Sequence, residues 1–141
     1  MSAYWVVVAN ASRVRIFEAD AHDSAMREII DMAHPASRLH AGELVSDRGG
    51  HVMNGTTGGH GVYRAEAARQ HQMDVFAREV CERLEQGRQE GSYRKLYVAA
   101  APQFLGLLRK YMGRPLHDMV REEVAKDLTV ADPERIRAQV M

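Results

Sequence analysis

Glycine and histidine gather in one polar stretch of the sequence, directly before a helical pattern. Gly58 and Gly59 precede His60, and Arg64 follows four residues later. Glycines let a backbone approach another molecule closely, and the free amides at a helix start favour anions. Because an imidazole can donate or accept a proton near neutral pH, His60 is the candidate catalytic residue. The combination suits contact with a phosphate backbone or an ester.

The same residues also fit two arrangements with less specific chemistry. A solvated loop whose glycines only make turns accounts for the glycines equally well. Four histidines recur at roughly ten-residue intervals and could in principle gather around a metal ion: His40, His51, His60 and His71. No His-x-x-x-His, His-x-His or cysteine pair accompanies them, so the sequence predicts neither a metal site nor a cofactor.

Nucleophilic catalysis has weak support in the sequence. Cys81 falls within the apolar face of the predicted long helix, where a cysteine is usually a small buried hydrophobe. Ser46 stands beside Asp47 but lacks the Gly-x-Ser-x-Gly pattern of a nucleophile elbow. The glycine-rich segment also lacks the Gly-Lys-Ser/Thr ending of a P-loop.

The elements that must position these residues begin with three predicted strands. Residues 4–9 are a continuous apolar run, which is typical of a central strand buried on both faces. Turn residues 10–12 and the extended pattern of 14–18 predict a hairpin, and 27–32 supply a third strand.

A long helix is predicted over about 62–86, with apolar residues at three- and four-residue spacing. Asp74 and Arg78 on its polar face predict an ion pair. A strand at 95–100 follows, and then a helix from Pro102 to Gly113. Alternation of helix and strand in this half favours parallel strands.

The last elements are a strand within 117–124, whose pattern also suits a helix, and a short terminal helix. Asp132 is the expected N-cap of that helix, with Pro133 at its first position. The sequence therefore predicts one α/β domain over 1–141, with a mixed sheet of about five strands and helices on both faces. A long glycine-rich loop occupies about 35–61, and loops of that length are usually functional or disordered.

Composition excludes several classes of protein. Lysine plus arginine equals aspartate plus glutamate, 19 each, so no global positive charge attracts nucleic acid or an anionic membrane. Arginines do recur along the loop and long helix, but interleaved acids favour a solvated face, and base-stacking aromatics are absent there except Tyr63. One cysteine, no signal-peptide pattern and no long apolar run predict a cytoplasmic protein without membrane insertion.

Several motifs together resemble a known family. They are Trp5 to Ser12 followed by Arg13 to Phe17; Ser46-Asp47-Arg48-x-Gly50; His71 five residues before Phe76-Ala77-Arg78-Glu79; Leu96 to Pro102; and Lys126-Asp127-Leu128-Thr129. Their order and spacing are similar to those of bacterial proteins required for attachment to host cells, within the bacterial and archaeal release-factor-like group. The resemblance covers nearly the whole chain.

The resemblance implies a ribonuclease-H-like fold, similar to the middle domain of archaeal and eukaryotic release factors. In those factors a Gly-Gly-Gln loop precedes a long helix and promotes hydrolysis of the peptidyl-tRNA ester on the ribosome. Gly58-Gly59-His60 stands at a similar place, with histidine where they have glutamine. Asp47, Arg48, Gly50, Arg64 and His71 are the further candidate recognition residues, the first two as a pair that orders the loop.

Two functions follow from these observations. The first is a translation-associated module that binds ribosome or tRNA through the glycine-rich loop and promotes ester hydrolysis. The second is a non-enzymatic protein-binding scaffold that affects attachment to host cells indirectly. Neutral net charge and the absence of a complete catalytic constellation favour the second.

Overall fold

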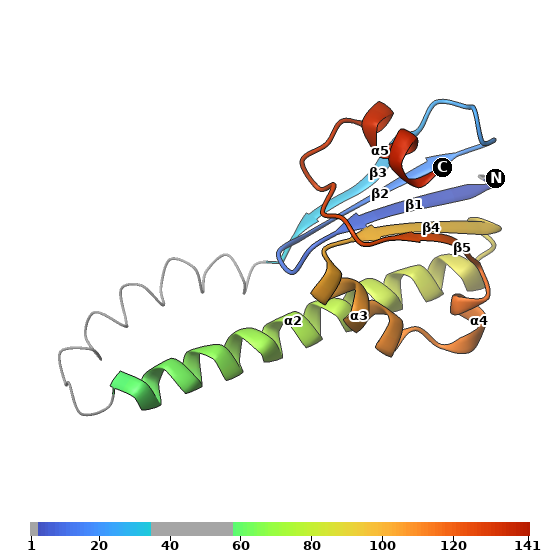
Figure 1. Cartoon of the computed structure of the whole chain (residues 1–141). Helices are drawn as coiled ribbons and strands as arrows, with labels where there is room; N and C mark the ends of the chain where they lie inside the picture. Colours follow the sequence, from blue (N-terminus) through green and yellow to red (C-terminus); the bar gives the residue numbers. More distant parts are fainter. Residues whose placement is uncertain (1–2, 35–57) are drawn as a thin grey trace.

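The computed structural model describes residues 3–34 and 58–141, apart from the side chains of 58–63. These residues form a five-stranded mixed sheet with helices packed on both of its faces (Figure 1). The predicted fold class, a mixed sheet of about five strands with helices, is confirmed.

The sheet has the strand order β3-β2-β1-β4-β5. Its strands are β1 (Tyr4–Ala9), β2 (Arg13–Ala19), β3 (Arg27–Ala33), β4 (Lys95–Ala100) and β5 (Val120–Val124). The first three strands pair antiparallel, whereas β4 is parallel to β1 and β5 is parallel to β4. Both expectations, the early hairpin and the later parallel strands, are therefore confirmed.

β1 lies at the centre of the sheet, as its apolar run predicts. Val6, Val7 and Val8 have no exposed surface. Alternate residues of the strand enter two separate cores, because successive side chains point to opposite faces of a sheet. Val7 belongs to the core under α2, and Val6 and Val8 belong to the core under α5.

One face of the sheet is covered by α2 (Gly58–Gln89), α3 (Pro102–Tyr111) and α4 (Arg114–His117). Phe76 is the first large buried side chain along the described part of α2, and it packs against Phe104 of α3. The part of α2 before Phe76 extends beyond the sheet (Figure 1). A helix of 32 residues is about 48 Å long, which exceeds what five short strands can cover.

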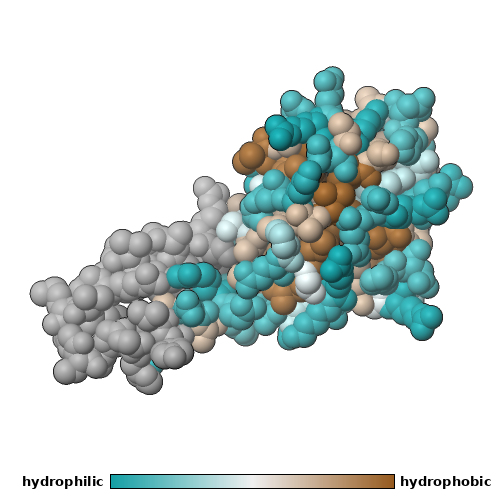
Figure 2. Space-filling view, viewed as in Figure 1, coloured by the Kyte–Doolittle hydropathy of each residue, from teal (hydrophilic) through white to brown (hydrophobic). Residues whose placement is uncertain are grey.

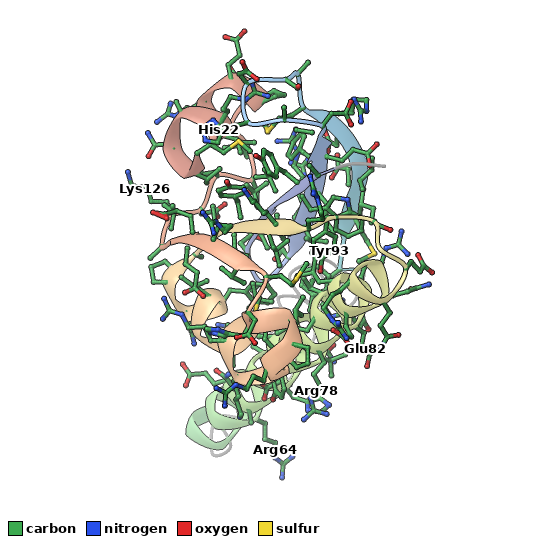
Figure 3. All side chains as sticks on the ribbon, turned by 90° about the vertical axis from the view of Figure 1, so that its right-hand side faces the viewer. His22, Arg64, Arg78, Glu82, Tyr93 and Lys126 are labelled. Carbon is green, nitrogen blue, oxygen red and sulfur yellow. The ribbon has the colours of Figure 1, made fainter. Side chains whose placement is uncertain are left out.

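The other end of α2 is anchored on Trp5 and Tyr93. The two rings stack with centroids 4.6 Å apart, and the Tyr93 hydroxyl donates to the carbonyl oxygen of Leu84 at 2.6 Å. Gly87 faces the indole, and Tyr93 lies between the sheet and α2 (Figure 3). Gly91, at a φ of 71°, lies in the turn that follows the helix.

The opposite face is covered by α5 (Pro133–Val140). Asp132 caps this helix, since its carboxylate accepts a hydrogen bond from the backbone N–H of Arg135 at 2.8 Å. Ile136 and Val140 pack onto Val6, Val8 and Phe17. The predicted cap and first-position proline of this helix are confirmed.

Two sequence expectations need correction. The long helix begins at Gly58 rather than near Val62, so the predicted loop at 35–61 ends before Gly58 and its remainder lies outside the described residues. Asp74 and Arg78 form no ion pair with each other, because both contact Tyr111. The strand expected within 117–124 is confirmed as β5, which follows the end of α4.

Candidate functional site

The projecting part of α2 carries two of the residues that the sequence singled out. Arg64 and His71 are exposed and lie seven residues apart, so they share one face of the helix with Arg78. None of the three forms an ion pair among the described residues. We call these three residues the α2 basic stripe; it spans about 21 Å at 1.5 Å per residue.

All three side chains of the stripe are exposed. Arg64 points away from the body of the domain (Figure 3). The described surface of the projecting helix is mainly hydrophilic, whereas hydrophobic groups gather over the sheet and its covering elements (Figure 2). A solvated face of this kind, with cations along it, is suited to binding an extended anion.

The glycine-histidine cluster lies in the first turn of α2. Gly58, Gly59 and His60 are helical, and no acidic residue stands in that turn. The first amides of a helix have no intrahelical partner, which leaves them able to bind an anion. Asp47, Arg48 and Gly50 lie outside the described residues, so their expected pairing stays a prediction.

Arg78, the last member of the stripe, borders a groove between α2 and α3. Its guanidinium lies 4.8 Å from the centre of the Tyr111 ring, and the Tyr111 hydroxyl donates to Asp74 at 3.0 Å. The contact with Tyr111 raises the pKa of Arg78 above its ordinary value. Arg78 is therefore a charged residue held against Tyr111 at the C-terminal end of the stripe. It borders a groove of about 440 Å³.

Cys81 lines this groove but does not have the character of a nucleophile. The residue is 5% exposed, and its thiol donates to the carbonyl oxygen of Leu108 at 3.5 Å. Burial, with a smaller contribution from the Glu82 charge, raises the pKa of the thiol to about 12. The thiolate is the reactive form, so Cys81 acts as a core residue, as the sequence predicts.

A polar network that sequence reasoning missed joins the β1–β2 turn to the segment before α5. The Asn10 amide donates to Asp127 at 2.9 Å and to the Thr129 hydroxyl at 3.2 Å. Its oxygen accepts from the backbone N–H groups of Ser12 and Arg13, at 2.8 and 2.9 Å. Every polar atom of the Asn10 side chain is thus bonded, which indicates a structural lock.

Thr129 is the buried member of the network. It is 3% exposed, and both its hydroxyl and its backbone N–H donate to Asp127, at 2.6 and 3.0 Å. Burial tends to raise the pKa of Asp127, but these hydrogen bonds and that from Asn10 outweigh it and hold the pKa below its usual range. The signal was available in the sequence, since these residues belong to its first and last motifs.

Arginines beside this network are paired with acids. Arg13 makes a two-pronged pair with Asp31, with both distances 2.9 Å. Arg15 does the same with Glu28 and also donates to the carbonyl oxygens of Thr129 and Ala131, at 3.0 and 2.8 Å. A hollow of about 630 Å³ lies here, and Arg13, which lines it, is already paired with Asp31.

Two classes of site are absent from the described ranges, 3–34 and 58–141. No group of three histidine, cysteine or acidic side chains there is placed to hold a metal ion. Among the helices of the same ranges, none combines the length and apolar character needed to cross a bilayer.

The fold and these sites define a small α/β domain with a long projecting helix. A hydrogen-bond network joins its β1–β2 turn to the segment before α5. Residues 5–140 match the model of a family described as "Protein required for attachment to host cells". The chain belongs to this family, which connects it with attachment to host cells. No curated protein matches the chain.

Proposed function

We propose that the protein is a translation-associated module that binds ribosomal RNA or tRNA through the α2 basic stripe. The observation that carries this proposal is the contrast between two sets of basic side chains. Arg13, Arg15 and Arg27 on the sheet are paired with carboxylates, whereas Arg64 and His71 project without an acidic partner among the described residues. Phosphate contacts supply most sequence-independent affinity for RNA.

Strand order supports the fold that this function implies. An antiparallel β1-β2-β3 unit followed by parallel β4 and β5 on the other side of β1 agrees with a ribonuclease-H-like sheet. The middle domain of archaeal and eukaryotic release factors is the expected structural relative. In this proposal α2, which begins at Gly58 and Gly59, takes the place of the long helix that follows the Gly-Gly-Gln loop of those factors.

RNA binding can be tested with a matched pair of variants. Arg64→Gln with His71→Gln removes two members of the stripe, and Arg114→Gln with His117→Gln makes the same changes at exposed positions of α4. We expect the first variant to bind tRNA about tenfold more weakly in fluorescence anisotropy, with a shallower salt dependence, because each lost phosphate contact removes roughly 0.7 from the slope for a single strand. The α4 variant should bind like wild type.

If the two variants bind tRNA with equal affinity, the α2 basic stripe does not contribute to RNA binding. Failure of wild type to bind tRNA, together with failure to co-sediment with ribosomes, would instead favour the second candidate. That candidate is a non-enzymatic scaffold, and the exposed apolar residues Ile29 and Met32 on edge strand β3 favour it. Ribosome binding requires a cytoplasmic location, which cell fractionation can check.

His60 remains the proposed catalytic residue for ester hydrolysis. In the proposed step water adds to the ester carbonyl of peptidyl-tRNA, which the free amides at the helix start polarise, and His60 delivers a proton to the tRNA 3′-oxygen as its bond to the carbonyl carbon breaks. In a peptide-release assay on ribosomes, we expect His60→Ala to lower the rate by 100-fold or more, on the order of the contribution of a general acid or base. If His60→Ala leaves both the release rate and ribosome binding unchanged, His60 has no catalytic role, and only the binding role of the protein is supported.

A further inference from the structure

A second polar hollow lies on the α5 face, at the sheet end away from Asn10. It measures about 430 Å³, and its lining includes His22, Tyr97, Arg121, Glu122, Gln139 and Met141. His22 comes from the β2–β3 turn and lies beside α5 (Figure 3). A volume of this size is within the range of small-ligand pockets.

An irregularity in β5 brings two charged residues to this hollow. Leu96 pairs with Val120 and Tyr97 pairs with Glu122, so Arg121 is an extra residue between the two partners. In a regular strand, consecutive side chains point to opposite faces, whereas Arg121 and Glu122 line the same cavity. Bulges of this kind commonly redirect side chains beside functional sites.

Aromatic rings form one side of the same region. Tyr4 meets His22 edge-to-face with centroids 6.3 Å apart, and it meets Tyr97 in the same way at 5.8 Å. Lys95 places its ammonium 5.3 Å from the centre of the Tyr4 ring. Tyr4 and Tyr97 are largely covered, so His22 is the ring whose exposed surface is available for stacking.

Polar groups for hydrogen bonding complete the set. Gln139 accepts a hydrogen bond from Lys126 through its side-chain oxygen at 2.9 Å, so its NH₂ group can donate into the hollow. The Glu122 carboxylate can accept. Donor and acceptor groups therefore stand beside the His22 ring and one lining cation, Arg121.

We infer that this hollow binds a nucleotide, with the base stacked on His22 and the phosphate at Arg121. The base edge then meets Gln139 and Glu122, and a carboxylate acceptor favours bases that carry an exocyclic amino group. Stacking on aromatic rings beside a cationic group is the usual way in which proteins bind single-stranded bases. Inorganic phosphate alone would use neither the His22 ring nor the Glu122 carboxylate, so these two groups favour a nucleotide.

The nucleotide can be free or part of an RNA chain. For the RNA chain, the inference rests on the RNA binding proposed above, and the hollow provides a second contact that is separate from the α2 basic stripe. A free nucleotide requires no such partner. Both sources share the same chemistry, so a mononucleotide and an oligonucleotide can be compared directly.

The test follows the His22 ring by NMR during titration with adenosine monophosphate, inorganic phosphate or a 12-nucleotide single-stranded RNA. We expect the nucleotide and the RNA, but not phosphate, to shift the His22 resonances. For the RNA, His22→Ala and Arg121→Gln should each weaken binding roughly tenfold or more. Arg114→Gln, at an exposed cation on α4, should have no effect, and circular dichroism melts check that each variant is folded.

The outcomes separate this inference from the RNA-binding proposal. If RNA binds but His22→Ala and Arg121→Gln leave the affinity unchanged, the hollow is not a nucleotide site, and the α2 stripe stands alone. If adenosine monophosphate shifts His22 while tRNA and ribosomes do not bind, the hollow takes free nucleotide and the RNA-binding proposal is wrong. Equal shifts with inorganic phosphate would overturn the base-stacking role.

Discussion

Replacing Gly87 with valine is expected to lower the free energy of unfolding by about 3 kcal/mol, at the upper end of the usual cost of overpacking a core. A Cβ atom at this position would lie 2.6 and 2.8 Å from two ring carbons of Trp5 and 3.1 Å from Tyr93. The indole cannot move aside easily, since it is 4% exposed and stacked on Tyr93. The helix would have to shift away from the sheet.

Gly106 provides the matched control for this substitution. It also lies within a helix, but a Cβ there would meet nothing within 4 Å. Gly106→Val should change stability by only about 0.5 kcal/mol, because valine and glycine differ little in helix propensity. Urea denaturation of both variants measures the difference. Similar losses at the two positions would show that helix propensity, rather than the contact with Trp5, determines the cost.

The Asn10→Asp variant is expected to lose about 3 kcal/mol of stability at neutral pH, from lost hydrogen bonds and like-charge repulsion. The new carboxylate would lie beside that of Asp127, where the Asn10 amide now donates at 2.9 Å. The hydroxyl of Thr129 would lose a donor as well. Exchanging the two groups in Asn10→Asp/Asp127→Asn restores one amide-carboxylate pair and should recover most of the loss.

The pH dependence of stability should differ between wild type and the Asn10→Asp variant. In wild type the pKa of Asp127 is lowered, so its contribution is present above the unfolded pKa of about 3.9 and is lost as pH falls through the folded pKa. In the variant, repulsion raises the pKa of one of the two carboxyls, so stability should increase as pH falls from 7 towards 5. Thermal melts across this range provide the measurement. Parallel pH profiles would contradict the assigned contact.

Elements with strong local signals could be predicted from the sequence. The apolar run of β1 required a place buried on both faces, and Asp132 with Pro133 marked the start of α5. The start of α2 could not be located in this way because glycine is a poor helix former, so Gly58 and Gly59 suggest a loop. Packing of Phe76 and the residues after it stabilises α2, and local propensity does not reflect tertiary contacts of that kind.

Side-chain partners across the fold were much harder to predict. Asp74 and Arg78 have ideal spacing for an ion pair, yet Tyr111 from α3 contacts both. The residues that line the α5-face hollow are scattered from His22 to Met141, and only the packing of the β2–β3 turn, β4, β5 and α5 brings them together. Sequence spacing reports neighbours along one element, so a site assembled from four elements has no periodic signature.

The lock between Asn10 and the segment from Asp127 to Ala131 also sets an order of events during synthesis. Its partners are 117 and 119 residues apart, so it closes only after nearly all of the described chain has left the ribosome. Until α5 docks, Val6, Val8 and Phe17 on that face of the sheet have no cover. Contacts of such separation form late and leave apolar surface exposed to aggregation or to chaperones. We therefore expect chains truncated before Asp127 to accumulate as chaperone-bound or insoluble species.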